Sequence, residues 1–257
     1  MKVFVINIFN KINNYYKRKG LYQTLKKIFS YALIKIGFKL PPPYQYIQTD
    51  VENNLAKYLG VDNSDIKNII IVGAHHGDEV KKMLKIYKSC KFHLFEPYKE
   101  YYDILNSKFQ HSKNIFIHNK AISNKKSITK FYDTNIEGSQ SILEPGKFAK
   151  EKYNISSHAE IDVETEKLDN IFSDEIIDCL WIDVQGAEGL VIEGAINLLE
   201  RTKAIFVEVS IREGLYNKGI IMSDIVSIAR KVNFELVGLG IDYDNFTGNA
   251  FLVKKII

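Results

Sequence analysis

The sequence predicts one main α/β domain in which helices cover a mainly parallel sheet of seven strands. From residue 68 onward, short apolar runs alternate with segments whose apolar residues recur every three or four positions, the pattern of strands alternating with helices. The last two apolar runs follow each other without a helix between them, which predicts a C-terminal antiparallel hairpin. A hydrophobic fraction of 46% over 257 residues suffices for one sizeable core.

The first expected unit is a strand at 68–73 that ends in a glycine and leads into a helix at 77–87. A second unit follows, with a strand stopped by Pro97 and an amphipathic helix at 98–109. The remaining expected strands cover 115–122, 179–184, 204–210, 234–241 and 249–256, and the remaining helices cover 187–200 and 220–232. Because strand and helix alternate, the strands are expected to run parallel.

A polar insert interrupts this alternation between residues 123 and 167. It is too long for an ordinary connection between two elements of a compact domain. Inserts of this length commonly contribute to a binding site, so we expect this one to border the functional site.

The N-terminal 48 residues differ from the rest of the chain in charge. They hold nine basic residues and no acidic one, which leaves 26 basic against 31 acidic residues in the remainder. Prolines 41 to 43 stop a helix and stiffen the connection, so we place a basic helical extension at 1–48 and the main domain at 49–257.

The apolar residues of this extension recur at helical spacing: Leu21, Leu25, Ile28, Phe29 and Leu33. Such a helix can lie on the inner face of an anionic membrane, in which case residues 1–40 make the membrane contact. Alternatively, its apolar face packs on the main domain or on a second subunit of a homo-oligomer. No nucleic-acid partner is expected, because the main domain is acidic. Cys90 and Cys179 show no paired spacing, which favours a cytoplasmic location.

In an open parallel sheet, ligands bind beyond the carboxyl ends of the strands. Polar and small residues gather at those ends here: 73–77 after the first strand, Glu96 after the second, Ala121 in the third, 183–188 after the fourth and Glu208 in the fifth. Glu96 lies about 19 residues past the glycine loop, the spacing at which such folds place an acid that binds a ribose. A nucleoside cofactor is therefore expected.

The stretch AHHGDE at 74–79 supports a second interpretation. It shares four of six positions with the AHPDDE pattern of zinc-dependent N-acetyl-sugar deacetylases. That family also uses a His-x-x-His pair, which this chain lacks, and Gly77 replaces one acid of the motif. A third interpretation treats His76, Asp78 and Glu79 as an ordinary strand-to-helix turn, with the acids stabilised by the helix dipole.

Five motifs follow one another along the chain: GAHHG at 73–77, FEP at 95–97, LDNIF at 168–172, WIDVQGAEGLVIEGA at 181–195 and IFVEVS at 205–210. Together they resemble the FkbM family of S-adenosylmethionine-dependent methyltransferases, in which GAHHG is similar to the G-A-N-x-G cofactor loop. The resemblance runs from about residue 68 to the C-terminus, and it implies a Rossmann-like class I methyltransferase fold. The chain departs from the pattern at Ile71, where many relatives have Asp, and at His75, where Asn is usual.

The resemblance also implies roles for individual residues. Those expected to bind the cofactor are Gly73, Ala74, His75 and Gly77 in the loop, Glu96 at the ribose, Ala121 and Ile122 near the adenine, and Asp183 and Gln185 beside the sulfonium. Asp183, Glu188 and Glu208 are the candidate catalytic residues. Trp181 is expected in the core and Tyr216 at an exposed position of the site.

The implied reaction is methylation of a hydroxyl, of a sugar in a surface glycan or of a small metabolite. A hydroxyl must lose its proton as it attacks the methyl group, so the candidate carboxylates either accept that proton or hold a divalent metal ion against the hydroxyl. The alternatives are the deacetylase and a non-catalytic module of the same fold that binds glycan machinery.

Overall fold

The computed structural model describes residues 51–242 and 246–255. The predicted basic extension at 1–48, its domain boundary and its helix therefore lie outside the described residues. None of the helices described is long and apolar enough to cross a membrane.

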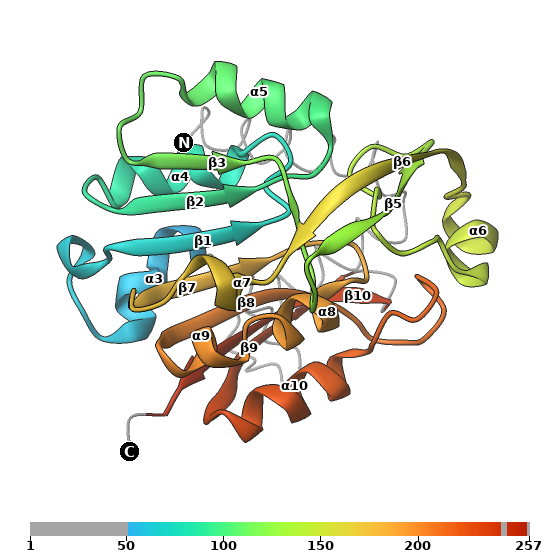
Figure 1. Ribbon diagram of the computed structural model, residues 1–257. Helices are drawn as coiled ribbons and strands as arrows, with labels where there is room; N and C mark the ends of the chain where they lie inside the picture. The colour runs from blue at the N-terminus through green and yellow to red at the C-terminus, as the bar shows by residue number, and fades with distance from the viewer. Residues whose placement is uncertain (1–50, 243–245, 256–257) are drawn as a thin grey trace, which may run out of the picture. The chain divides into compact units, whose positions relative to one another are not determined.

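A seven-stranded sheet forms the centre of the described domain (Figure 1). Its order is β3-β2-β1-β7-β8-β10-β9, and β10 pairs antiparallel with both of its neighbours, whereas the other pairs are parallel. The strands are β1 (Asn68–Val72), β2 (Lys91–Phe95), β3 (Ile115–His118), β7 (Ile177–Ile182), β8 (Thr202–Ser210), β9 (Phe234–Ile241) and β10 (Thr247–Lys254). The predicted parallel sheet with an antiparallel C-terminal hairpin is confirmed.

Two apolar cores lie on opposite faces of this sheet, because successive side chains of a strand point to opposite sides. Ile69 and Ile71 belong to one core and Ile70 to the other. The first core is completed by helices α3 (Val51–Leu59), α4 (Asp78–Ile86) and α5 (Lys99–Phe109), and the short 3-10 helix η1 (Asn63–Asp65) lies between α3 and β1. The second is completed by α7 (Leu168–Ile171), α8 (Glu188–Glu193), α9 (Ile196–Glu200) and α10 (Met222–Lys231).

The helix expected at 187–200 is interrupted between α8 and α9. Gly194 ends α8, and a Cβ added there would lie 2.1 Å from the carbonyl oxygen of Ser123. The same glycine accepts a hydrogen bond from the backbone N–H of Asp169 at 3.1 Å. The break therefore results from close packing against distant segments, which periodicity alone does not reveal.

The polar insert forms a second, smaller sheet of order β4-β6-β5. It consists of β4 (Ala121–Ile122), β5 (Ser127–Thr134) and β6 (Ser157–Glu166), with α6 (Lys147–Tyr153) between the last two. The single strand expected at 115–122 is thus wrong, because its second half belongs to this sheet. The small sheet lies at the end toward which the arrows of β1 and β2 point (Figure 1).

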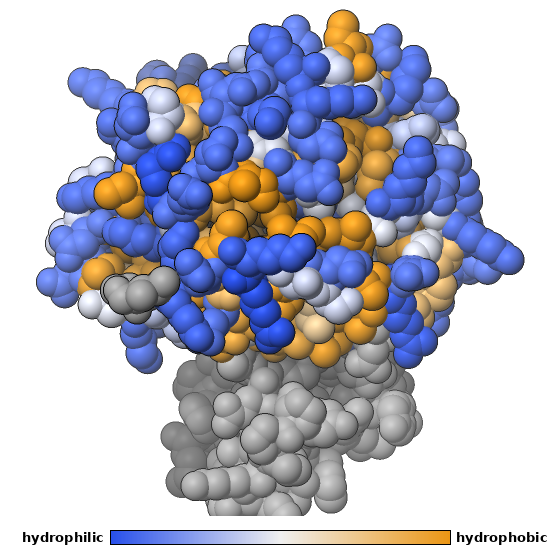
Figure 2. Space-filling view, turned by 60° about the horizontal axis from the view of Figure 1, so that its bottom comes forward, coloured by the Kyte–Doolittle hydropathy of each residue, from blue (hydrophilic) through white to orange (hydrophobic). Residues whose placement is uncertain are grey.

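The face of the described domain in Figure 2 is mostly polar, with apolar side chains gathered near its middle. Large side chains that remain exposed include Ile128, Ile176 and Val237, of which Ile128 is 71% exposed. They come from three different strands or loops, so they do not define one shared element face.

Candidate active site

The loop after β1 is a tight turn built on two glycines with left-handed backbone angles. Gly73 has a φ of +83°, and a Cβ added there would lie 1.7 Å from the carbonyl oxygen of Asp183. Gly77 has a φ of +66°, and a Cβ there would lie 2.8 Å from the side chains of Leu105 and Phe109. Both positions therefore require glycine, for their angles and for space.

Glu96 follows β2 directly and is 4% exposed. Its Oε2 accepts a hydrogen bond from the backbone N–H of His75 at 2.9 Å, and its Oε1 accepts one from the backbone N–H of Tyr98 at 2.9 Å. Burial raises the pKa of Glu96 to about 7, although the two backbone donors oppose this shift. Glu96, the residue predicted to bind the ribose, therefore lies against the glycine loop, which also contains His75 and the buried Ala74.

Asp183 and Glu208 lie at the ends of neighbouring strands and share one partner. The side-chain amide of Gln185 donates to Asp183 Oδ1 at 2.8 Å and to Glu208 Oε2 at 2.7 Å. All three residues are half-buried. Gln185 has a φ of +55°, which turns its side chain back toward the strand ends.

The two carboxyl groups differ in their ease of ionisation. Burial raises the pKa of Asp183, and the hydrogen bond from Gln185 opposes that shift. Burial also raises the pKa of Glu208 well above its ordinary value, and the charges of Asp183 and Glu188 raise it further. The two carboxyl groups therefore titrate as a pair, in which the pKa of Glu208 is raised further than that of Asp183.

Glu188 is placed differently from the other two candidate carboxylates. It is 2% exposed, and its Oε1 accepts hydrogen bonds from the backbone N–H groups of Val184 at 3.2 Å and Gly186 at 3.1 Å. Burial raises the pKa of Glu188 to about 7. Its contacts hold the loop after β7, and they leave its predicted role as a catalytic residue untested.

Ala121 and Ile122, expected near the adenine, form the short strand β4 and are both buried. Ala121 packs with Phe131 of the small sheet, whereas Ile122 packs in the main core with Leu168. Since adjacent side chains of a strand point to opposite sides, only one of them can face a ligand with its side chain. Any contribution of Ile122 to an adenine site comes from its backbone.

The insert reaches the loop after β7, as expected for an insert that borders the site. Ser141 donates a hydrogen bond through Oγ to the carbonyl oxygen of Val184 at 3.2 Å. Tyr216 donates to the carbonyl oxygen of Ser139 at 2.8 Å and lies 3.2 Å from Gln185 Oε1. The expectation that Tyr216 is exposed is wrong, because it is 4% exposed and fills the space beside Gly186.

The two histidines of the loop form a further group with the insert. The rings of His75 and His76 stack with centroids 4.0 Å apart, and Glu137 Oε1 lies 3.8 Å and 3.5 Å from their Nε2 atoms. Within the described residues, these three are the one group whose side chains converge as metal ligands would. Asp183, Glu188 and Glu208 do not converge in that way, so the expected divalent metal at those carboxylates has no support.

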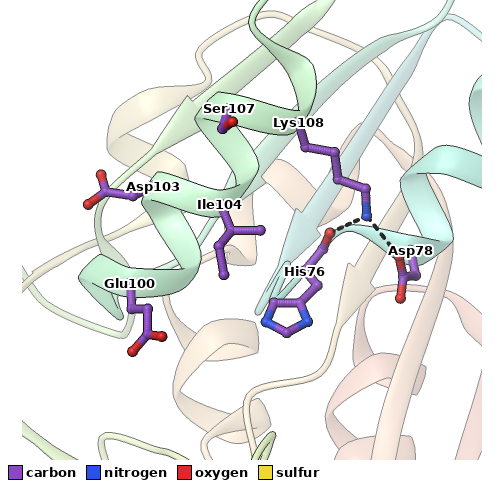
Figure 3. Close-up of a pocket in the computed structure, with 7 residues that line it drawn as sticks. All are labelled: His76, Asp78, Glu100, Asp103, Ile104, Ser107 and Lys108. Carbon is purple, nitrogen blue, oxygen red and sulfur yellow. Dashed lines mark hydrogen bonds and ion pairs between the residues drawn. The ribbon is translucent and has the colours of Figure 1, made fainter.

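An open hollow of about 720 Å³ lies between the loop that carries His76 and helix α5 (Figure 3). Its lining includes Glu100, Asp103 and Lys108, and none of the strand-end carboxylates. Lys108 Nζ donates to the carbonyl oxygen of His76 at 2.6 Å and pairs with Asp78 at 2.7 Å. These contacts of Lys108 tie α5 to the loop after β1. The hollow is separate from the strand-end site, because it shares none of the carboxylates of that site.

Comparison with known proteins identifies the family. Residues 72–236 match the family described as the methyltransferase FkbM domain, which covers the loop after β1, Glu96 and all three candidate carboxylates. The chain belongs to the FkbM methyltransferase family. As an FkbM methyltransferase it is S-adenosylmethionine-dependent, and its strand order is that of the class I methyltransferases.

A curated relative and several solved structures are similar to this FkbM methyltransferase. The 2-O-methyltransferase NoeI of Sinorhizobium fredii is 28% identical over 179 residues, which are 66% of this chain and 72% of that protein. An rRNA methylase from Streptococcus thermophilus has a TM-score of 0.46 at 10% identity, over 84% of this chain and 100% of that chain. The N-methyltransferase NodS from Bradyrhizobium japonicum, in complex with S-adenosylhomocysteine, has a TM-score of 0.45 at 8% identity, over 83% and 89%.

Family membership decides between the interpretations of AHHGDE. The stretch lies inside the FkbM domain, so the deacetylase interpretation is wrong. Asp78, one of the acids that a linear metal motif would need, is paired with Lys108 instead. The departure at Ile71 is accommodated structurally, because this side chain is 3% exposed and packs in the core with Leu94 and Trp181.

Proposed function

We propose that this FkbM methyltransferase transfers a methyl group to a hydroxyl of a sugar, in a surface glycan or a comparable small metabolite. The observation that carries the proposal is the linked pair of half-buried acidic residues, Asp183 and Glu208, beside the cofactor loop. The similar protein NoeI is named as a 2-O-methyltransferase, which supports a hydroxyl acceptor.

The glycine loop and Glu96 fit S-adenosylmethionine. Gly73 and Gly77 keep side chains away from the end of β1, so a cofactor can approach the backbone there. Each oxygen of Glu96 accepts one backbone hydrogen bond and retains a lone pair for a ribose hydroxyl. Gln185 and Asp183 would lie beside the methionine part. When bound, the cofactor supplies a methyl group on a positively charged sulfur.

Asp183 is the proposed proton acceptor. Its carboxylate lies at a strand end, and the amide of Gln185 fixes one of its oxygens and leaves the other free of that contact. The acceptor hydroxyl forms the new oxygen–carbon bond as the sulfur–carbon bond breaks, and its proton passes to Asp183. The raised pKa of Glu208 favours its protonated form, which can donate a hydrogen bond within the pair.

Glu188 is proposed as a positioning residue. Its Oε1 binds the two backbone N–H groups on either side of Gln185, so it fixes the turn that carries the amide. Because it is 2% exposed, it does not reach an acceptor in solution. Glu188 thus acts on the reaction through the orientation of Gln185.

An acceptor screen tests the proposed function. The full chain is incubated with S-adenosylmethionine and a panel of sugars, glycolipids and non-sugar alcohols, and mass spectrometry records the addition of one methyl group. We expect methylation of a sugar hydroxyl and its loss in Asp183→Asn. Transfer to a nitrogen or to a carbon acceptor, with the sugars unchanged, would contradict the proposal.

A further inference from the structure

The adjacent histidines of the cofactor loop adopt a defined arrangement. His75 has a left-handed backbone with a φ of +46°, which lets its ring stack on that of His76 with centroids 4.0 Å apart. The ring of Tyr101 from α5 contacts both, with centroid distances of 4.3 Å to His75 and 4.9 Å to His76. The two imidazoles are therefore held face to face by packing.

A third polar group comes from the insert. Glu137 lies in the turn after β5, and its Oε1 is 3.5 Å from His76 Nε2 and 3.8 Å from His75 Nε2. Gln140 Nε2 donates to the hydroxyl of Tyr101 at 3.2 Å, which ties this turn to the residue that packs on both histidines. The turn is also closed on itself, because Thr134 and Ser139 hydrogen-bond at 2.7 Å.

We propose that His75, His76 and Glu137 form a binding site for a divalent transition-metal ion, with zinc as the best fit. Zinc accepts imidazole nitrogen and carboxylate oxygen at about 2.0 to 2.2 Å, so tetrahedral ligand atoms are roughly 3.3 Å apart. The two separations between imidazole and carboxylate exceed that value by only a few tenths of an ångström, and the ligand atoms of all three residues lie within 4.8 Å of one another. A water molecule would complete the coordination.

The surroundings of His75 favour a bound cation. Its Nε2 is buried and lacks a hydrogen-bond partner among the described residues, so a ligand bond would satisfy it. The carboxylate of Glu137, 3.8 Å from this nitrogen, attracts positive charge.

Asp78 is not part of the site. Figure 3 shows the imidazole of His76 pointing away from Asp78, which pairs with Lys108 at 2.7 Å. The ligands therefore come from the loop and from an insert about 60 residues later, rather than from the linear AHHGDE stretch. A bound ion would join the turn of the insert to the cofactor loop, which would couple metal binding to cofactor binding.

The experiment uses the full chain without a histidine tag, titrated with Zn²⁺ by calorimetry and with Co²⁺ by visible absorption. We expect one equivalent to bind and Co²⁺ to give the absorption of a tetrahedral complex. Glu137→Gln and His76→Ala should each lower the affinity for the metal ion at least about tenfold. Removing a residue that only hydrogen-bonds to a metal ligand already costs about that much affinity, and these two residues would be ligands themselves. His111→Ala, which removes an exposed histidine elsewhere, is the matched control and should bind as the wild type does.

Two results would overturn the site. One is absence of stoichiometric binding in the wild-type chain. The other is binding that His111→Ala weakens as much as Glu137→Gln does. Neither result bears on methyl transfer, because the readout is metal binding by the protein without cofactor or acceptor.

Discussion

The side-chain amide of Gln185 lies 2.7 Å from the carboxyl group of Glu208 and so joins the loop after β7 to the end of β8. The same nitrogen donates to Asp183, which makes Gln185 the bridge between two groups that would otherwise repel each other. The bridge keeps both side chains in place before any ligand binds.

Removing this bridge should impair catalysis. Gln185→Ala should lower kcat/KM by about 1.5 to 3 kcal/mol in transition-state free energy, the usual contribution of hydrogen bonds to charged groups. The pH profile of kcat should shift as well, because the variant changes the ionisation of the pair. Wild-type kcat/KM together with an unchanged profile would show that the bridge has no catalytic role.

Asp183→Asn tests the proposed proton acceptor. The amide keeps the shape of the side chain but cannot take up the hydroxyl proton, so kcat should fall by about 10² to 10⁴. Affinity for S-adenosylhomocysteine should change much less than kcat. Calorimetry and initial rates measured on the same preparation check both expectations, and a fully active variant would remove Asp183 from the mechanism.

The buried carboxyl of Glu188 should make stability depend on pH. Its pKa is about 7 in the fold against 4.5 in the unfolded chain, so the folded state takes up the proton more readily. This stabilisation is complete below pH 4.5 and is lost as the pH rises through 7. Glu188→Gln lacks that loss, so the wild type should become less stable relative to the variant by up to about 3 kcal/mol over this range.

Urea unfolding of both proteins at several pH values measures that difference directly. A stability difference that is the same at pH 5 and at pH 8 would contradict the buried, proton-binding state of Glu188.

Gly73→Ala should destabilise the fold for two reasons. The added Cβ would lie 1.7 Å from the carbonyl oxygen of Asp183, and the φ of +83° disfavours an L side chain. Gly60→Ala is the matched control, because its φ is +68° but nothing lies within 4 Å of the added atom. We expect the free energy of unfolding to fall by about 1 kcal/mol in Gly60→Ala and by clearly more in Gly73→Ala. Equal decreases in the two variants would show that the packing around Gly73 is not tight.

The N-terminal segment gives a prediction that rests on sequence alone. If its nine basic residues and apolar spacing direct it to anionic lipid, the full chain should float with anionic liposomes at low salt and a version lacking residues 1–40 should not. If the two proteins float to the same extent, or if neither floats, the segment does not direct membrane binding. The alternative, that it packs on protein, would then be favoured. The predicted contact with the inner membrane face depends on this result.

Much of the central sheet could be predicted from local pattern. β1 is a continuous apolar run because both of its faces are covered, and the strand expected at 234–241 matches β9 residue for residue. Gly73 and Glu96 were found because strand ends in a parallel sheet converge at one edge. These features depend on neighbouring residues or on a general rule of topology.

Features that depend on distant contacts could not be predicted. The break at Gly194 comes from the carbonyl oxygen of Ser123, and the burial of Tyr216 comes from Ser139 in the insert. The meeting of Glu137 with His75 joins segments about 60 residues apart. Nothing in the local sequence of any of these residues identifies its partner.

Titration of the purified chain with S-adenosylhomocysteine, alongside Glu96→Ala, tests the central claim most directly. The account predicts one binding site in the wild-type chain, and affinity lowered by about 1.5 to 3 kcal/mol in the variant, because Glu96 holds the ribose next to the loop that carries His75. Tight binding of NAD with no response to S-adenosylhomocysteine, or equal affinity of both proteins for S-adenosylhomocysteine, would contradict it.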